Sequence, residues 1–285
     1  MPTSSLLEPD QYSIGDYQGF TGTWMNYSLP FALSLGKDVA SLPAFQGVEP
    51  DVMRDLMATA HTAQYQKGTV FLAQGEQVLR YYMMLEGWCG ASKGNAEGQE
   101  TILQLFRRGD FLFESAAEVP VDFCPMNLLA LTQVHLLTLS PTAVRDAVKR
   151  SPIFAANVLA ASIQQCQNLR DHIEHLTLHN AEQRVGRFLL QLRLNTGSGG
   201  TDIVLPFDKS LIATYLGIKP ETLSRVFQVF RERGFTIERS HLTMPSRQAL
   251  CVYCDKAAMR ICPFANTENC LVAAKNTGIA PSSGT

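Results

Sequence analysis

Four of the seven cysteines of this 285-residue chain lie close together near its end, in the stretch CVYCDKAAMRICPFANTENC. They are Cys251, Cys254, Cys262 and Cys270, and their spacing is C-x2-C-x7-C-x7-C. Four thiolates complete a tetrahedral zinc site, or bind the corners of a 4Fe–4S cluster, without help from any other side chain. The stretch therefore predicts a metal site placed after most of the fold.

The spacing of the four thiols bears on the choice between these cofactors. Structural zinc usually takes two close pairs of cysteines, whereas here only Cys251 and Cys254 are close. Pro263 directly follows Cys262, and a Cys-Pro pair is frequent at cluster ligands because proline has no competing amide hydrogen. We expect an iron–sulfur cluster, of the 4Fe–4S type. Structural zinc, a thiol switch and an unligated tail are the alternatives.

Other residues with metal or redox chemistry are weaker candidates. Cys89 and Cys124 stand apart in a β-rich region, where buried cysteines commonly serve as small core residues. His172, His175 and His179 lie at helical spacing and offer haem as an option, although solvated side chains are the more frequent outcome of such a pattern. The chain contains no nucleophile elbow, P-loop, dinucleotide glycine motif or zinc-hydrolase motif, so we do not expect an enzyme.

Composition and cysteine usage limit the class of protein and its compartment. With 46% hydrophobic and 18% charged residues, the chain is expected to form two domains of a soluble globular protein. Its first residues, MPTSSLLEPDQYS, lack a basic segment followed by an apolar run, and the longest apolar stretch, LLALTQVHLLTL, is too short and polar to span a bilayer. Clustered thiols without a secretion signal favour a cytoplasmic protein with no membrane partner.

The net charge of −2 hides an uneven distribution. Residues 181–248 carry ten Lys and Arg against six Asp and Glu, whereas residues 1–180 carry eleven against eighteen. The local field, rather than the total charge, attracts phosphate groups. The basic segment is therefore a candidate for nucleic-acid binding.

Sequence patterns divide the chain into five segments of an α+β protein. Short strand-like runs broken by glycines, such as QYQKGTVFLAQGE and YYMMLEGWCGASKG, indicate a β jelly roll. A helical pattern follows, from about Pro141 to Leu194, with an interruption near Asn180. The expected segments are an N-terminal extension over 1–45, a jelly roll over 46–145, a dimerisation helix over 146–180, a winged helix-turn-helix over 181–248 and a cysteine-rich tail over 249–285.

The long helical segment carries a pattern that predicts a homodimer. Its seam positions fall alternately three and four residues apart, as in a coiled coil, at Leu159, Ser162, Cys166, Leu169, Ile173, Leu176 and Asn180. The predicted dimer contacts are Leu159, Cys166, Leu169, Ile173 and Leu176. One amphipathic helix packed on its own domain is the alternative. Because the seam includes Ser, Cys and Asn, it would be a weak interface alone, and the dimer would need further contacts elsewhere in the protein.

Residues 208–234 read DKSLIATYLGIKPETLSRVFQVFRERG, the pattern of a helix-turn-helix. Asp208 can cap a first helix, Ala213 suits a close crossing of two helices, and Gly217 supplies the turn. Pro220 fits the first position of the second helix. The alternative is an ordinary helical hairpin. In that case both the spacing from Ala213 to Gly217 and the basic character of the second helix would be coincidences.

The second helix of this motif supplies the candidate DNA contacts. Glu221, Ser224 and Arg225 share one exposed face near its amino-terminal end, from which a recognition helix reaches base edges in the major groove. The segment FTIERSHLTM that follows predicts a β wing. Weaker candidates, which contact phosphate or only keep the surface soluble, are Lys209, Arg231 and Arg233.

The order of jelly roll, long helix and winged helix-turn-helix resembles the Crp/Fnr family of bacterial transcription regulators. The stretches KGTVFLAQGE, YYMMLEGWCGASKGNAEGQETILQLFRRGDFLFE and IATYLGIKPETLSRVFQVFRERG carry the resemblance. It implies a cyclic-nucleotide-binding-like jelly roll, a homodimer on double-stranded DNA, and RNA polymerase as a further partner. ETLSR is similar to the Fnr branch, which implies an inverted repeat of TTGAT-type half-sites. Pro220 stands where the Crp branch has arginine, and Lys219 stands at an N-cap where Ser or Thr is common.

The resemblance does not identify the signal. Cyclic-nucleotide sensors of the family keep a Gly-Glu pair and an Arg-Ser pair for the phosphate, whereas here Phe113 precedes Glu114 and no arginine lies between Arg108 and Arg145. A phosphate buried without a cation is costly, so cyclic AMP is not expected. Fnr's cysteines ahead of the jelly roll have no counterpart, since Cys89 is the first cysteine of this chain.

We therefore interpret the sequence as a DNA-binding transcription regulator whose DNA affinity is set by a redox- or gas-sensitive iron–sulfur cluster in the tail. The alternative is a Crp/Fnr-type regulator that senses a small molecule in the jelly roll and carries structural zinc in the tail. The two hypotheses share the DNA-binding fold and differ in the cofactor and the signal.

Overall fold

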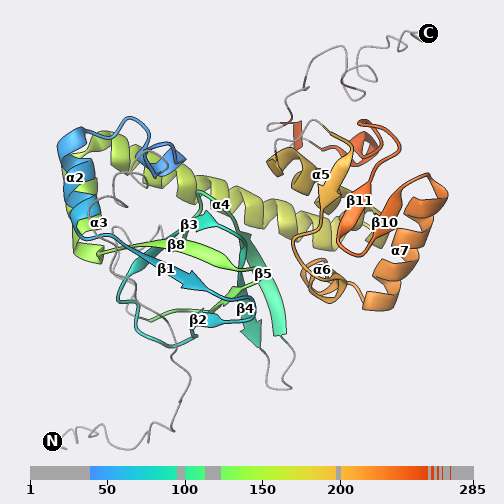
Figure 1. Ribbon diagram of the computed structural model, residues 1–285, viewed down its shortest axis with the longest axis horizontal. Coiled ribbons are helices and arrows are strands. Elements are labelled where there is room, and N and C mark those ends of the chain that lie inside the picture. Colours follow the sequence, from blue (N-terminus) through green and yellow to red (C-terminus); the bar gives the residue numbers. More distant parts are fainter. Residues whose placement is uncertain are drawn as a thin grey trace, which may run out of the picture.

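The computed structural model describes residues 39–94, 100–112, 123–196, 200–255, 258–259, 262, 265 and 270. Within these residues, the chain folds into a β jelly roll, a long helix and a winged helix-turn-helix domain (Figure 1). The architecture is α+β, as predicted. Of the predicted N-terminal extension, residues 39–45 are described, and four of their apolar side chains, those of Val39, Leu42, Ala44 and Phe45, join the jelly-roll core.

The jelly roll consists of two antiparallel sheets whose strand orders are β1-β8-β3-β6 and β2-β7-β4-β5. Strand β8 reads VHLLTL and is almost wholly buried, because it lies between β1 and β3. The elements of this part of the chain are η1 (Pro43–Phe45), α2 (Pro50–Ala58), β1 (His61–Tyr65), β2 (Val70–Leu72), β3 (Tyr81–Glu86), β4 (Cys89–Gly94), β5 (Glu100–Phe106), β6 (Phe111–Leu112), β7 (Asn127–Ala130), β8 (Val134–Leu139) and α3 (Pro141–Arg150).

Helix α4 (Pro152–Leu178) runs from the jelly roll to the C-terminal domain (Figure 1). The segment predicted as one dimerisation helix, residues 146–180, forms parts of two helices. Helix α3 ends at Arg150, Ser151 is extended, and α4 begins at the next residue. The Ser151 hydroxyl caps α4 by accepting a hydrogen bond from the amide of Phe154 at 3.0 Å. The proline that follows Ser151 lacks an amide hydrogen and therefore suits a new helix start better than a helix interior.

The C-terminal domain begins where the sequence predicts an interruption, since α4 ends at Leu178 and α5 starts at Ala181. Its short strands form one antiparallel sheet of order β10-β11-β9, in which the β10–β11 hairpin is the predicted wing. The elements are α5 (Ala181–Thr196), β9 (Asp202–Val204), α6 (Lys209–Tyr215), α7 (Pro220–Glu232), β10 (Thr236–Glu238), β11 (His241–Thr243) and η3 (Cys251–Tyr253). In the part of the chain described, no helix combines the length and apolar character that a membrane crossing requires.

The C-terminal domain packs directly on the outer face of the jelly roll. The ring of Trp88 meets that of Phe207 edge to face at 5.5 Å, and the Lys67 ammonium lies 3.3 Å from the Asp208 carboxylate. Buried Ile102 and Leu131 of the jelly roll belong to the same apolar cluster as the core of the C-terminal domain. The two domains therefore share a packed boundary, and α4 runs along it.

Candidate nucleic-acid interface and metal centre

Helices α6 and α7 form the predicted helix-turn-helix. Asp208 caps α6, because its carboxylate accepts a hydrogen bond from the amide of Leu211 at 3.0 Å. Ala213 is 1% exposed at the crossing of the helices, and its carbonyl accepts from the amide of Ile218 at 3.0 Å across the turn. Gly217 adopts a φ of 60°, a left-handed conformation that a residue with a Cβ adopts only with strain. The motif is built as the sequence predicts.

Helix α7 presents the predicted reading face to solvent. It starts at Pro220, and Lys219 makes no side-chain hydrogen bond as its N-cap. Its inner face buries Leu223, Val226, Phe227 and Phe230, whereas Glu221, Ser224 and Arg225 are exposed. Gln228 is also exposed, one turn beyond Ser224, and extends the same face. Sequence reasoning missed Gln228, although its helical spacing from Ser224 and Arg225 was available as a signal.

The three predicted phosphate contacts differ in their surroundings. Lys209 is exposed, and its ammonium lies 5.5 Å from the centre of the Phe227 ring. The Arg231 guanidinium donates weakly to the carbonyl of Ile237 at 3.4 Å. Arg233 is also exposed, but its guanidinium is engaged by two partners described next. Lys209 is therefore the most available of the three for DNA.

Arg233 belongs to a network that fixes the start of the cysteine-rich tail. Its guanidinium donates to Glu182 at 2.7 Å and to the hydroxyl of Tyr253 at 2.8 Å. The Tyr253 hydroxyl in turn donates to Glu182 at 2.8 Å, and its ring packs on the backbone of α5 at Gly186. A Cβ at Gly186 would lie 2.4 Å from that ring. The tail thus docks on α5 and on Arg233, the C-cap residue of the recognition helix.

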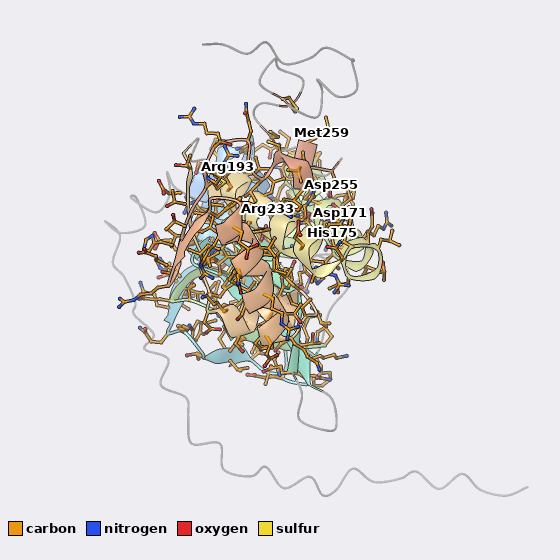
Figure 2. The ribbon with its side chains drawn as sticks, turned by 90° about the vertical axis from the view of Figure 1, so that its right-hand side faces the viewer. Asp171, His175, Arg193, Arg233, Asp255 and Met259 are labelled. Carbon is orange, nitrogen blue, oxygen red and sulfur yellow. The ribbon has the colours of Figure 1, made fainter. Side chains whose placement is uncertain are left out.

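A second anchor follows immediately after Cys254. One oxygen of Asp255 lies 3.1 Å from Nε2 of His175 on α4, and the other contacts Nη1 of Arg187 on α5. Figure 2 shows Asp255 beside His175, above the body of the C-terminal domain. Burial alone would raise the pKa of Asp255, but hydrogen bonds from His175 and the backbone amide of Ala258, together with the charge of Arg187, hold it below its usual range. The carboxylate therefore stays ionised between its partners.

The four predicted metal ligands influence one another electrostatically. Burial and the proximity of Cys251 and Cys262 raise the pKa of the Cys254 thiol to about 11, against the opposing charge of Arg187. Burial and the proximity of Cys262 and Cys270 also raise the pKa of Cys251. Across the described residues, however, no three His, Cys, Asp or Glu side chains stand close enough to hold a single metal ion. Without metal the Cys251 and Cys254 thiols stay protonated at neutral pH, so binding a metal to them must release protons.

Two buried arginines on α5 face this thiol group. Arg187 is 3% exposed and opposes the rise in the pKa of Cys254, and Arg193 is 6% exposed and does the same for Cys251. Arg193 also donates to the carbonyl of Arg247, in the segment between the wing and the thiols. Buried positive charges close to a thiol stabilise its ionised form, the thiolate, which is the form that binds metal. Sequence reasoning did not find these arginines, because their burial beside the tail is decided by tertiary packing.

The long helix exposes a stripe that differs in part from the predicted seam. Leu159, Ile163 and Ile173 are 62%, 50% and 60% exposed, and Cys166 is exposed between them. These four residues, which we call the α4 stripe, keep the spacing of a coiled-coil seam. The two other predicted contacts, Leu169 and Leu176, are half-buried and line a cavity within the chain. The face that includes them is turned toward the C-terminal domain.

The remaining candidates of the sequence lie in or beside the jelly roll. Cys89 and Cys124 are buried, as expected of core residues. Phe113 and Glu114, which bear on cyclic-nucleotide binding, lie outside the described residues. His172 stacks on Tyr215 with ring centres 4.3 Å apart, and burial together with the charges of His175 and Arg184 lowers its pKa to about 4.

Comparisons with known proteins agree with this architecture. The profile of the cyclic nucleotide-binding domain matches residues 62–151, and that of the Crp-like helix-turn-helix domain matches residues 183–253. The chain is 25% identical to a probable transcriptional regulator, flp, of Lacticaseibacillus casei, over 70% of this chain and 90% of the relative. It is 23% identical to the CRP-like cAMP-activated global transcriptional regulator of Mycobacterium tuberculosis, over 67% and 86% of the two chains.

Solved structures show the same fold. The structure of FixK2 from Bradyrhizobium japonicum superposes with a TM-score of 0.62 at 20% identity, over 69% of this chain and 98% of that one. A protein from Ruegeria pomeroyi described as a putative cyclic nucleotide binding protein superposes with a TM-score of 0.54 at 26% identity, over 73% and 92% of the two chains.

A sensor-type jelly roll joined by a long helix to a winged helix-turn-helix defines a DNA-binding transcription regulator. The chain belongs to the Crp/Fnr family of these regulators. The predictions of family, fold class and DNA binding are therefore confirmed, and the relatives are regulators rather than enzymes.

Substitution of Gly186 by alanine tests how the tail is docked. Alanine would improve the helix propensity of α5 by roughly 1 kcal/mol, yet its Cβ would collide with the Tyr253 ring at a cost of about 1–3 kcal/mol. We expect urea unfolding to show no net gain in stability, and Cys251 and Cys254 to react faster with a thiol reagent. Gly200→Ala, whose Cβ would meet nothing closer than 3.9 Å, is the control. Unchanged thiol reactivity in Gly186→Ala would contradict the docking.

Proposed function

We propose that this regulator controls transcription through an iron–sulfur cluster bound by Cys251, Cys254, Cys262 and Cys270. The observation that carries the proposal is that Cys251 lies within electrostatic range of the other three thiols, and Cys254 within range of Cys251 and Cys262, beside two buried guanidinium groups. Four thiolates and a cluster carry net negative charge, which Arg187 and Arg193 would balance. The expected compartment for this activity is the cytoplasm.

The spacing of the thiols in the sequence supports a cluster over a single zinc ion. Structural zinc usually takes two close pairs of cysteines, whereas here only Cys251 and Cys254 form a close pair. A cluster binds each thiolate to a different iron atom and so accepts ligands that stand further apart.

The docking network supplies a physical route from the thiols to DNA. Tyr253, which lies between the first two thiols, bonds to Arg233 at the end of the recognition helix. Asp255, next to Cys254, contacts α4 and α5. When bound, the cluster would supply folding free energy to the short tail and a redox- or gas-sensitive centre. Loss of the cluster would release the tail and change the position of α7, because the hydrogen bond between Arg233 and the Tyr253 hydroxyl would break.

Replacing Cys254 or Cys262 by serine tests this function. We expect iron and sulfide content to fall and operator affinity to change by roughly 1–3 kcal/mol, the usual size of coupling between two sites. Anaerobically purified protein is assayed for iron, sulfide and zinc, and its operator binding is measured at constant salt before and after exposure to oxygen or nitric oxide. Cys124→Ser, in the jelly roll, is the control, because its hydroxyl can keep the hydrogen bond that the Cys124 thiol donates to the carbonyl of Met126.

Two outcomes would contradict the proposal. Stoichiometric zinc without iron or sulfide would favour the alternative of a structural zinc site and a small-molecule signal in the jelly roll. Unchanged operator affinity, and an unchanged response to oxygen and nitric oxide after loss of the cluster, would show that the tail is not the sensor.

We also propose specific roles for the reading face of α7. Arg225 would donate two hydrogen bonds to guanine, Glu221 would accept from the paired cytosine, and Ser224 would touch a neighbouring thymine. In the protein without DNA, the Ser224 hydroxyl donates to the carbonyl of Pro220 at 3.0 Å, so this bond must rearrange or be shared on binding. An inverted repeat of TTGAT-type half-sites is the expected target.

Arg225→Ala tests the base contact. We expect a loss of about 1–3 kcal/mol in operator affinity and relaxed discrimination at one base pair, because a bidentate contact to guanine is lost. Binding is measured by fluorescence anisotropy against operators that vary at each position of the half-site. Lys209→Ala is the comparison, since loss of a phosphate contact lowers affinity for all sequences alike and flattens the salt dependence. Unchanged discrimination in Arg225→Ala would refute the assignment.

A homodimer through the α4 stripe is a further part of the proposal, and RNA polymerase is the expected partner on DNA. The stripe leaves three large apolar side chains exposed at coiled-coil spacing, and a second copy of α4 would cover them. An inverted repeat also requires two recognition helices related by a twofold axis.

Ile173→Glu tests the dimer. A charge in a buried seam costs several kcal/mol, so we expect monomers in analytical ultracentrifugation at low micromolar concentration, with weak operator binding. Leu178→Glu is the control, because Leu178 is 75% exposed but lies off the stripe. Dimers that persist in Ile173→Glu would contradict the stripe as the interface.

A further inference from the structure

The hairpin that joins β10 to β11 has a two-residue turn at its tip. Glu238 and His241 form the last pair of the hairpin, so Arg239 and Ser240 alone make the turn. Arg239 has a φ of 49°, and in the part of the chain that the structure describes it is the one non-glycine residue with a positive φ. Two-residue hairpin turns usually have Gly, Asn or Asp where φ is positive, because other residues adopt this conformation at a cost in free energy.

Hydrogen bonds fix the hairpin on both sides of this tip. The carbonyl of Ser240 accepts from the amide of Leu205, the residue after β9, at 2.7 Å. On the other side, the guanidinium of Arg231 on α7 donates weakly to the carbonyl of Ile237 on β10 at 3.4 Å. Figure 1 shows β10 and β11 beside α7. The tip is therefore connected both to the sheet and to the recognition helix.

The side chain of Arg239 has no partner that would explain its backbone conformation. It is exposed, and its guanidinium makes no hydrogen bond or ion pair with any residue that the structure describes. A backbone conformation of this kind persists where something compensates for its cost, and such positions concentrate at functional sites. The guanidinium of Arg239 is therefore free to bind a partner outside the chain.

The chemistry of the tip indicates which part of DNA would bind Arg239. Glu238, directly before it, is exposed as well, so the tip lacks the uniformly positive surface that suits a broad contact with phosphates. A two-residue turn instead presents a single side chain, which the minor groove, about 6 Å wide, can admit. Narrow A·T-rich minor grooves have an enhanced negative potential, and a guanidinium is more weakly hydrated than an ammonium, so arginine suits them.

We infer that Arg239 enters the minor groove beside each half-site and favours A·T pairs there. With α7 in the major groove, the hairpin beside it reaches the adjoining minor groove, because the two grooves alternate along the duplex. The inference rests on the proposed placement of α7 on DNA, but it concerns base pairs outside those assigned to Glu221, Ser224 and Arg225. The operator that this regulator prefers would then extend beyond the inverted repeat.

Selection from a pool of random DNA duplexes tests the inference without assuming a half-site. The full-length parent is expected to enrich a twofold-symmetric core with A·T pairs directly outside each half. Arg239→Gly should enrich the same core without this preference, and it should stay folded because glycine adopts a positive φ without strain. Arg225→Ala should instead change the core and keep the outer A·T pairs.

The selected sequences separate this inference from the proposed reading face. An unchanged core in Arg225→Ala would contradict the reading face alone. Selection by the parent of a core without outer A·T pairs, or selection of these pairs by Arg239→Gly, would overturn the minor-groove contact alone.

Affinities for two matched duplexes measure the size of the contact. Both duplexes contain the selected core, and they carry either A·T or G·C pairs outside it. The parent should bind the A·T duplex at least about fivefold more tightly, whereas Arg239→Gly should bind the two equally. Arg239→Lys should keep only part of the preference. Arg54→Gln, which removes the same charge from an exposed position on α2, is the control and should match the parent.

Two results of these measurements would overturn the inference. One is a full A·T preference in Arg239→Gly. The other is an equal loss of affinity for both duplexes with a flatter salt dependence, since that result indicates a phosphate contact rather than a contact in the groove.

Discussion

The carboxylate of Asp255 joins three parts of the molecule, which are α4, α5 and the tail. It contacts His175 on α4 and Arg187 on α5, and it belongs to the tail directly after Cys254. A guanidinium buried to the extent of Arg187 is tolerated only with a counter-charge, so the tail must stay close to α5 for as long as Arg187 stays buried. The position of the tail, the orientation of α5 and the end of α4 are therefore set together.

Helix α5 also contacts the recognition helix and the segment that carries the thiols, so its position affects both. Glu182 binds Arg233 and Tyr253, Gly186 admits the Tyr253 ring, and Arg193 holds the segment that precedes the thiols. Arg233 closes the recognition helix, so among the described residues Tyr253 and Arg233 link the thiol-bearing segment to the end of α7. So short a route suits a switch, because few contacts have to change between two states.

The jelly roll and the C-terminal domain meet at a packed boundary. Trp88 packs on Phe207 across it, and the cavity beside it is lined by both domains and by α4. The cyclic nucleotide-binding domain profile matches the jelly roll, over residues 62–151. The buried arginines beside Cys251 and Cys254 belong instead to α5, on which the tail docks.

The sequence by itself determined the order of the domains and the helix-turn-helix, because caps, turn glycines and helical spacing act within a few neighbouring residues. The reading face of α7 and the four thiols as metal ligands are predictions that the sequence also made, from helical spacing and from side-chain chemistry. Only the tertiary structure decided that Arg233 bonds to Tyr253 of the tail, that Leu169 and Leu176 turn inward while Ile163 completes the α4 stripe, and that Arg187 and Arg193 are buried beside the thiols. These outcomes depend on which helix faces lie against one another, and residues far apart in the chain decide that by packing.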